Sequence, residues 1–470
     1  MALENTHYGS AAIKEMLSGC KSVYFLGIGG INMSSLAHIT HTHGFRVGGS
    51  DRRMSELTAR LAREGIEIFE GHDAKNIADY DALVYTVAVS YDNPEYLCAM
   101  ERGIPCISRA DYLGYIMTDY KMRIGISGMH GKSSCTSMCA EVLMRGDTDP
   151  TVLSGAELSS MGGAWRVGGR DIFLFEACEY MDSFLDFEPT VAVILNIEMD
   201  HVDYFKSMDH IRTSYGRFAD IAGKDGVCVA NSDDADVMLA IKDYAGKIVT
   251  FGIDNDADVR AVNIRTERGH YCFSVLCDGQ KYCDVKLSVF GYHNIYNALA
   301  TAAVAWLCGL DGNDVSNGLA AFVGAKRRME YKGRCNGAEL YDDYGHHPTE
   351  VKATLLGARD ICKGRLWCVF QPHTYSRTST LFDDFADALR VADRVIVSDI
   401  YAARETDTLG VSAEKLAAAV GGSAVAADSF TRAADILKTE LCDGDVAVVM
   451  GAGDVWRIFE YMDGEENEQI

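Results

Sequence analysis

The chain has 470 residues, which at roughly 150 residues per domain predicts about three domains. Its 68 acidic and 44 basic residues leave a net charge of −24, which argues against nucleic acid or an anionic membrane surface as a partner, because both need a basic face. Hydrophobic residues make up 48% and charged residues 24%, so several apolar cores can form and a disordered chain is excluded.

The cysteines predict a reducing compartment. There are 15 of them, scattered from Cys20 to Cys442, and none forms the C-x-x-C pair typical of zinc and thioredoxin sites. Scattered thiols of this kind are typical of a cytosolic protein. The N-terminal segment MALENTHYGSAAIKEM lacks the layout of a signal peptide, and no apolar run is long enough to span a bilayer. We therefore expect a cytoplasmic protein, either a monomer or a homodimer.

Short apolar runs alternate with longer amphipathic stretches along the whole chain, which is typical of α/β layers with mostly parallel strands. The pattern restarts at three expected strands, at 22–27, 123–127 and 338–344. We therefore predict an α/β protein of three domains, with residues 1–120, 121–325 and 326–470 in successive domains.

The first expected strand runs into a glycine-rich loop, GIGGINMS at 27–34. Glycines let the backbone turn tightly after a strand and let a pyrophosphate approach the N-terminus of the next helix. Asp51 follows the next apolar run, about where a dinucleotide fold carries a ribose-binding acid. The spacing is G-x-G-G and not the full G-x-G-x-x-G. This loop alone therefore indicates either a structural turn or a nucleotide site, and a dehydrogenase stays possible.

A second loop, GMHGKSS at 128–134, follows the expected strand at 123–127. In such a loop backbone N–H groups cradle phosphate oxygens, Lys132 reaches the terminal phosphates and the Ser133 hydroxyl can bind Mg²⁺. Ile126 stands where the general pattern has its first glycine, so a structural turn remains an alternative. The candidate phosphate-binding residues are Gly128, Met129, His130, Gly131, Lys132, Ser133 and Ser134.

Two further strand ends add candidate metal ligands. The expected strand at 171–175 ends at Glu176, and the one at 191–195 is followed by NIEMDH, which ends at His201. Because the carboxyl ends of parallel strands share one edge, Ser133, Glu176 and His201 can converge on one metal. Oxygen ligands suit Mg²⁺, whereas a histidine is unusual for it. The sequence therefore predicts an ATP–Mg²⁺ site.

The third segment carries one basic run and two polar runs. Residues 326–334 hold five positive charges, which indicates either a solvated surface or a group that closes over phosphates. The runs DDYGHHPTE at 342–350 and QPHTYSRT at 371–378 each follow an apolar strand. Their histidines indicate metal binding, acid–base chemistry or helix capping. Arg377 suits a substrate carboxylate, because its fork binds one bidentately.

In this order the motifs resemble those of the Mur ligases of peptidoglycan synthesis, from about residue 21 to 460. The resemblance is carried by GIGGINMSSLA (27–37), GMHGKSS (128–134), EACEYMDSFL (176–185), NIEMDHVDYF (196–205), GYHNIYNALA (291–300), KRRME (326–330), DDYGHHPTE (342–350), QPHTYSRT (371–378) and GAGDV (451–455). The runs at 342–350 and 371–378 look like those of the L-alanine-adding branch, and unlike those of the branches that add D-glutamate or a diamino acid.

The resemblance implies a Rossmann-like N-terminal domain for a UDP-sugar, a central P-loop ATPase-type domain with a parallel or mixed sheet for ATP, and a Rossmann-like C-terminal domain for the amino acid. It implies ATP- and Mg²⁺-dependent ligation of L-alanine to the lactyl carboxylate of UDP-N-acetylmuramate through an acyl phosphate. The implied catalytic residues are Lys132, His201, Arg328 and His346. The implied ATP contacts are residues 128–134, His293, Asn294, Arg328 and Asp343. The implied substrate contacts are Gly27, Gly29, Gly30, Asp51, Tyr344, His346 and Arg377, and the implied metal ligands are Ser133, Glu176 and His201.

Some positions depart from the family pattern. Met129 and Ser133 stand where Thr is commoner, and Gly345 replaces a usual Ala. The stretch CEY at 178–180 replaces a more acidic one, so no role is carried over to it. The alternatives are a ligase for serine, glycine or a recycled murein peptide, and a nucleotide-binding protein without catalysis. The intact Lys132 argues against the last, and the run at 371–378 argues against a peptide-adding enzyme.

Overall fold

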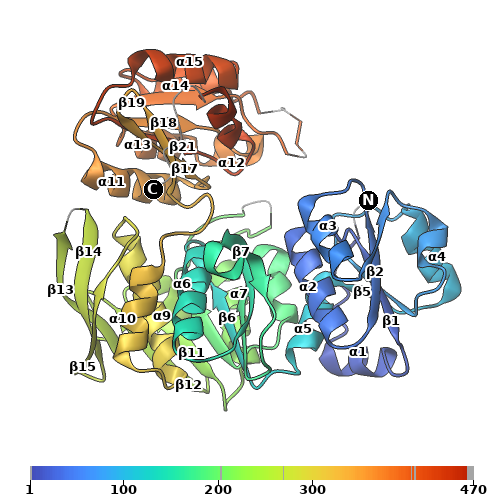
Figure 1. The fold of residues 1–470 in the computed structure, drawn as a ribbon. Helices are drawn as coiled ribbons and strands as arrows, with labels where there is room; N and C mark the ends of the chain where they lie inside the picture. Colours follow the sequence, from blue (N-terminus) through green and yellow to red (C-terminus); the bar gives the residue numbers. More distant parts are fainter. Residues whose placement is uncertain (1–2, 202–203, 268, 404, 407–408, 463–470) are drawn as a thin grey trace. The chain divides into compact units, whose positions relative to one another are not determined.

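The computed structural model describes residues 3–201, 204–267, 269–403, 405–406 and 409–462, and the chain is an α/β protein as predicted (Figure 1). It divides into two compact units, which are described separately. One comprises Met1–Ile197 with Asp209–Thr250, and the other Glu198–Met208 with Phe251–Ile470. Within the motif at 196–205, residues 202–203 lie outside the described part.

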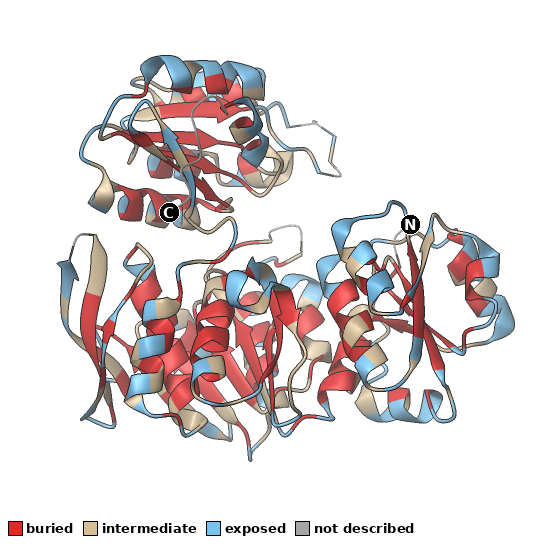
Figure 2. Ribbon diagram, viewed as in Figure 1, coloured by how far each residue is buried: buried red, intermediate tan, exposed pale blue. Residues whose placement is uncertain are grey.

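The first sheet has the Rossmann-like strand order β3-β2-β1-β4-β5, with every neighbouring pair parallel. Its strands are β1 (Ser22–Leu26), β2 (Arg46–Asp51), β3 (Glu67–Glu70), β4 (Ala82–Tyr85) and β5 (Cys106–Ser108). The helices of this part are α1 (Ser10–Met16), α2 (Ile31–Thr42), α3 (Glu56–Arg63), α4 (Pro94–Arg102) and α5 (Arg109–Met117), with the 3₁₀ turn η1 (Ala74–Ile77). All five residues of β1 are buried, as expected for a central parallel strand covered on both faces (Figure 2).

The second sheet in this unit is mixed, as predicted for the central domain. Strands β12, β11, β10, β6, β9, β7 and β8 follow in that order, and only the edge pair β7–β8 is recorded as antiparallel among them. The strands are β6 (Met122–Ser127), β7 (Thr151–Leu158), β8 (Gly163–Arg166), β9 (Ile172–Glu176), β10 (Val191–Ile194), β11 (Val227–Asn231) and β12 (Lys247–Gly252). The accompanying helices are α6 (Lys132–Arg145), α7 (Met208–Ile221) and α8 (Ala235–Ala240), with the 3₁₀ segments η2 (Ser159–Met161) and η3 (Tyr180–Asp186).

The other unit begins with an antiparallel meander of β13 (Val259–Glu267), β14 (His270–Cys277) and β15 (Gln280–Lys286), followed by α9 (His293–Leu307) and α10 (Gly312–Ala321). It continues as a sheet of order β16-β17-β21-β18-β19-β20, parallel except at the edge strand β16. These strands are β16 (Glu330–Cys335), β17 (Ala338–Asp343), β18 (Leu366–Phe370), β19 (Arg394–Ser398), β20 (Val425–Ala427) and β21 (Val446–Met450). The helices are α11 (Pro348–Ile361), α12 (Tyr375–Thr380), α13 (Phe382–Leu389), α14 (Ala413–Val420) and α15 (Phe430–Glu440), and η4 (Val455–Tyr461) follows β21.

The β16–β21 sheet is buried on both faces, because two separate apolar clusters cover it. Alternate residues of β18 divide between them: Cys368 and Phe370 belong to one cluster, and Trp367 and Val369 to the other. The run at 342–350 accordingly begins with the last two residues of β17, and the run at 371–378 begins directly after β18. All 15 cysteines are free thiols, as expected. In the described part of the chain, no helix combines the length and apolarity needed to cross a membrane.

Candidate active site

The first glycine loop forms the tight turn that its sequence predicts. Gly27 has φ +85°, and a β-carbon there would lie 2.7 Å from the Thr86 methyl group, so glycine is needed on both counts. The Gly27 N–H donates to the Ser50 carbonyl of β2 (2.9 Å). The Asp51 carboxylate accepts the Gly29 N–H (2.9 Å), so in this structure it holds the loop. Its contact with a sugar, and those of Gly27, Gly29 and Gly30, stay predictions.

A buried glutamate that no sequence pattern indicated contacts strands β1 and β2 beside this loop. Glu95, on α4, is 0% exposed and accepts hydrogen bonds from the Tyr24 hydroxyl (2.7 Å), the Ser50 hydroxyl (2.6 Å) and the Asn76 amide (2.8 Å). The His72 ring nitrogen lies 3.0 Å from the same carboxylate. Burial, together with the charge of Glu95, raises the pKa of Tyr24. Because the Ser50 carbonyl also accepts the Gly27 N–H, the network around Glu95 helps to fix the glycine loop.

The second glycine loop connects β6 to α6 and has two left-handed glycines, Gly128 (φ +143°) and Gly131 (φ +84°). The backbone N–H groups of Met129 and His130 both donate to Asn196, to its carbonyl (3.2 Å) and its side-chain oxygen (2.8 Å). The Asn196 amide in turn donates to the His130 carbonyl (2.9 Å). Asn196, two residues after the end of β10, was not among the predicted site residues, although a polar residue near a strand end is its signal.

Asn196 divides the loop into two parts. Met129 and His130 donate their backbone N–H groups to Asn196. For the amides from Gly131 to Ser134 no acceptor is recorded in the described part. These amides form the first turn of α6, where the helix dipole also favours an anion. A phosphate cradle therefore fits residues 131–134 better than the whole predicted run 128–134.

Lys132 forms a buried ion pair. Its ammonium donates to the carbonyls of Gly128 (2.6 Å) and Met129 (3.1 Å) and lies 2.9 Å from the carboxylate of Glu179. The two side chains are 13% and 1% exposed. Burial alone would lower the pKa of Lys132, but the charge of Glu179, with smaller contributions from Cys178 and Glu176, raises it. Glu179 lies in the stretch 178–180 to which the sequence assigned no role.

Two of the three predicted metal ligands lie at one edge of the same sheet. Ser133 is buried in the first turn of α6, and Glu176 ends β9, which pairs with β6 through Ile126. Their hydroxyl and carboxylate oxygens are the ligands that Mg²⁺ prefers, so this donor set fits that ion. His201 belongs to the other compact unit and has a left-handed backbone (φ +50°). Metal binding by all three stays a prediction.

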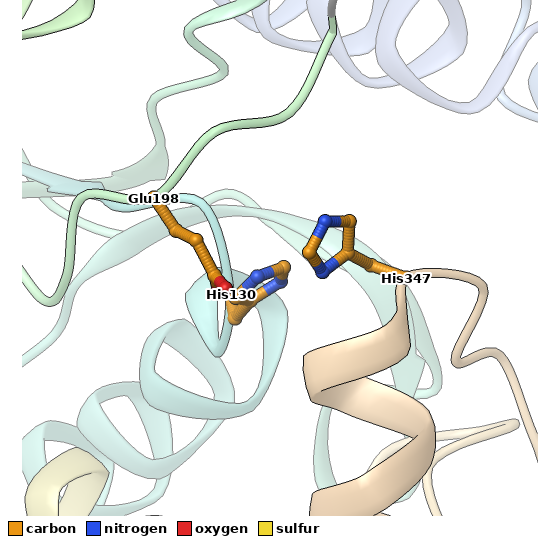
Figure 3. Close-up of side chains that lie close together, drawn as sticks. All are labelled: His130, Glu198 and His347. Carbon is orange, nitrogen blue, oxygen red and sulfur yellow. The ribbon is translucent and has the colours of Figure 1, made fainter. Parts of the chain in front are cut away.

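The paired histidines of the third segment have separate places. His347 caps α11. Its ring nitrogen accepts the backbone N–H of Thr349 (3.4 Å), and its backbone N–H donates to the Glu350 carboxylate (3.3 Å). The Thr349 hydroxyl donates to Glu198 (2.6 Å) in the segment after β10. Figure 3 shows the side chains of His347 and Glu198 of this unit, together with His130 of the second glycine loop. Of the predicted roles for the paired histidines, the structure supports helix capping for His347.

Arg327 fastens the basic run to the sheet that follows it. Its guanidinium donates to the Asp342 carboxylate (3.2 Å) and to the carbonyls of Gly451 (2.6 Å) and Gly453 (3.3 Å). Its own carbonyl accepts the Tyr344 N–H (2.8 Å). Burial raises the pKa of Asp342 to about 6, and Arg327 opposes that rise. The sequence selected Arg328 and missed Arg327, because charge alone does not distinguish two adjacent arginines.

Arg328 and Asp343, both expected at the nucleotide, meet at the end of β17. Each of Arg327 and Arg328 places its guanidinium near the Tyr344 ring, at 5.0 and 5.4 Å from the centroid. The buried Asp343 carboxylate accepts the N–H groups of Met329 (2.9 Å) and Gly345 (2.8 Å). In this structure Asp343 is thus an anchor of the chain, and its nucleotide contact stays a prediction.

Three residues predicted to hold the amino acid form one cluster together with His373, which was not among the predicted site residues. His346 approaches the Tyr344 carbonyl (3.1 Å), and its ring lies 5.7 Å from that of His373. His373 in turn lies 3.3 Å from a terminal nitrogen of Arg377. Burial lowers the pKa of His346 to about 4, so the ring is uncharged at neutral pH. An uncharged ring can accept a proton, but this pKa makes His346 a weak base.

The adenine contacts predicted for His293 and Asn294 fall at the start of α9. His293 is exposed, whereas Asn294 is buried and donates to the Phe290 carbonyl (2.7 Å). Asn297 donates to the side-chain oxygen of Asn294 (2.9 Å). These bonds fix the loop before the helix, and contact with a base stays a prediction.

Family models and relatives match most of the chain. The models described as Mur ligase family, catalytic domain, as Mur ligase middle domain and as Mur ligase, glutamate ligase domain match residues 22–121, 126–305 and 327–453. The chain is 43% identical to a UDP-N-acetylmuramate–L-alanine ligase of Acetivibrio thermocellus, over 94% of this chain and 95% of that protein. It is 44% identical to the ligase of that name from Clostridium novyi, over 94% and 96%.

Solved structures share the fold. A UDP-N-acetylmuramate–alanine ligase from Thermotoga maritima superposes with a TM-score of 0.77 at 27% identity, over 94% of this chain and 98% of that one. A murein peptide ligase from Psychrobacter arcticus has a TM-score of 0.70 at 23% identity, over 95% and 100%. The second likeness concerns the fold alone. The three-domain α/β architecture expected from the sequence is confirmed.

Proposed function

The chain belongs to the Mur ligase family, and we propose that it joins L-alanine to the lactyl carboxylate of UDP-N-acetylmuramate at the expense of ATP, a step of peptidoglycan synthesis. Identity of 43% over 94% of the chain to ligases of that activity carries the proposal. The cluster of Tyr344, His346, His373 and Arg377 supports L-alanine as acceptor, because the planar fork of an arginine suits the carboxylate of a small amino acid. We also infer a cytoplasmic location, since all cysteines are free thiols.

The reaction proceeds in two steps. The lactyl carboxylate attacks the γ-phosphate of ATP, which gives an acyl phosphate and ADP. The neutral amine of L-alanine then attacks the acyl carbon, and phosphate leaves. Negative charge grows on the transferred phosphoryl group in the first step, so the main task of the protein is to stabilise that charge and to position the reactants.

The residues of the chain divide this work. The amides from Gly131 to Ser134 and the ammonium of Lys132 hold and neutralise phosphate oxygens, and Arg328 adds positive charge. Ser133 and Glu176, with His201 as the third predicted ligand, would hold Mg²⁺, which would supply further charge stabilisation. Arg377 holds the carboxylate of L-alanine, and the nearby uncharged His346 can take a proton from the amine.

The test is an acceptor screen with purified protein, ATP, Mg²⁺ and UDP-N-acetylmuramate. ADP and phosphate should appear with L-alanine, and mass spectrometry should find UDP-N-acetylmuramoyl-L-alanine. Serine, glycine and the murein tripeptide are the competing acceptors. Faster turnover with one of these would replace L-alanine as the substrate, and no ADP with any of them would refute the proposal of a ligase.

A further inference from the structure

Arg377 has a buried acidic partner that the sequence did not indicate. Asp200, in the segment 198–208 of the same compact unit, is 6% exposed. One of its carboxylate oxygens lies 3.3 Å from Nε and 3.1 Å from Nη2 of Arg377. The same oxygen accepts the backbone N–H of His201 (2.6 Å). The side chains of Asp200 and Arg377 are 8% and 12% exposed, so the pair is largely withdrawn from water.

The pattern of these bonds decides which edge of the guanidinium remains for a ligand. A guanidinium has five N–H groups in a planar fork. Asp200 accepts from Nε and from one hydrogen of Nη2, and the His373 ring nitrogen lies 3.3 Å from Nη1. No other partner of the guanidinium is recorded among the residues that the structure describes. Because Asp200 occupies the Nε side of the fork, the side left for the two oxygens of a carboxylate is the end between Nη1 and Nη2.

Holding the arginine in this orientation has an energetic consequence. A free arginine side chain samples many rotamers, and a ligand must otherwise overcome this loss of entropy when it orders the side chain. Arg377 lies on α12, a helix of only 6 residues, so its own helix offers a short support. Asp200 and His373 hold its side chain before any ligand arrives, and this preorganisation strengthens binding of the ligand.

We propose that Asp200 is the positioning residue that turns the end of the Arg377 fork toward the carboxylate of L-alanine. The inference rests on the proposed function, which it extends by one residue. Asp200 acts through Arg377 and contacts no substrate itself. Replacement by asparagine keeps a side-chain oxygen that can accept the His201 N–H, so Asp200→Asn should weaken capture of L-alanine and leave formation of the acyl phosphate, which precedes attack by the amine, in place.

The experiment compares Asp200→Asn with the natural protein in two assays. Steady-state kinetics should show that the KM for L-alanine rises about 10- to 100-fold, since a misplaced binding group costs this much. Without L-alanine, hydroxylamine traps the acyl phosphate as a hydroxamate, and its rate of formation should change by less than about threefold. Asp200→Glu keeps the charge but moves it, so its KM should lie between the other two. It also covers the case in which Asp200→Asn fails to fold.

Asp445→Asn is the matched control. Asp445 is also a buried aspartate paired with an arginine, 2.9 Å from Arg365 and 3% exposed, but it lies at the start of β21, away from the strand ends that carry the cluster. This variant should lose stability and keep the KM for L-alanine.

Three results would overturn the proposal. The first is an unchanged KM in Asp200→Asn. The second is an equal loss in the hydroxamate assay, which would assign Asp200 to the nucleotide side. The third is strictly multiplicative effects when Asp200→Asn is combined with Arg377→Lys, because two residues that act as one unit are non-additive. If the natural protein itself does not use L-alanine, the proposed function fails first, and the two failures are thereby distinguished.

Discussion

Replacing Lys132 by methionine separates a structural role of this lysine from its catalytic one. The change removes the ammonium and keeps an apolar stem of similar length. It leaves the carboxylate of Glu179, which is 1% exposed, without its cation. At 2.9 Å and an effective dielectric constant of about 20, the attraction between the two charges is about 6 kcal/mol, of which desolvation offsets a part. We expect the free energy of unfolding of this part of the chain to fall by about 3–5 kcal/mol.

The double variant Lys132→Met with Glu179→Gln provides the matched comparison. It has no buried charge at this place, so most of the lost stability should return. Catalysis should not return, because the ammonium that neutralises phosphate is absent in both variants, and kcat should stay about 10²- to 10³-fold below that of the natural protein. Urea unfolding followed by circular dichroism gives the stabilities, and release of ADP gives the rates.

The pH dependence of this effect has a definite sign. The folded-state pKa of Lys132 is raised, so the stability that the ion pair contributes is fully present below the unfolded pKa of about 10.4 and is lost only at higher pH. The difference between the single variant and the natural protein should therefore be constant from about pH 6 to pH 9. A single variant that loses less than about 1 kcal/mol, or a double variant that is less stable than the single one, would refute this reasoning.

Arg327→Ala should lower kcat and destabilise the protein by about 3–5 kcal/mol in urea unfolding, because the buried Asp342 loses its partner, whereas Arg334→Ala in the same basic run should do neither. In His346→Asn the free energy of unfolding should fall less between pH 7 and pH 5 than it does in the natural protein. The folded-state pKa of His346, about 4, lies below the unfolded value of about 6.5. The contribution of the uncharged ring to the free energy of unfolding is therefore complete above about pH 6.5 and is lost as pH falls toward 4. Urea titrations at pH 5 and 7 measure this loss. Glu95→Ala should lower the free energy of unfolding by about 3 kcal/mol, because the groups that donate to Glu95 lose their acceptor. Calorimetry should also show weaker binding of UDP-N-acetylmuramate to this variant.

Each of these expectations has a contrary outcome. Equal loss of activity in Arg327→Ala and Arg334→Ala would mean that only the charge of the basic run matters. An unchanged slope of stability between pH 5 and 7 in His346→Asn would show that the ring is charged in the folded protein. Unaltered sugar binding in a folded but destabilised Glu95→Ala would confine the Glu95 network to stability.

Local sequence patterns were sufficient to predict the main strands and the strand ends where chemistry can occur. Strands at 22–26, 122–127, 172–176, 191–194, 338–343 and 366–370 agree with the expected ones within one or two residues. The predicted turns at Gly27 and Gly128 are left-handed in the structure. These features are local, because apolar runs with glycine or polar residues at their ends report strand ends and allowed backbone angles directly.

Only the tertiary structure decided which side chains meet. Lys132 and Glu179 are 47 positions apart, Arg327 and Gly451 are 124 apart, and Asp200 and Arg377 are 177 apart. For Lys132 and Glu179 the cause is the pairing of β6 with β9, and no spacing in the sequence reports it. The physical reason is that an ion pair or a hydrogen bond depends on distance in space and on the exclusion of water, whereas a motif records only neighbours along the chain.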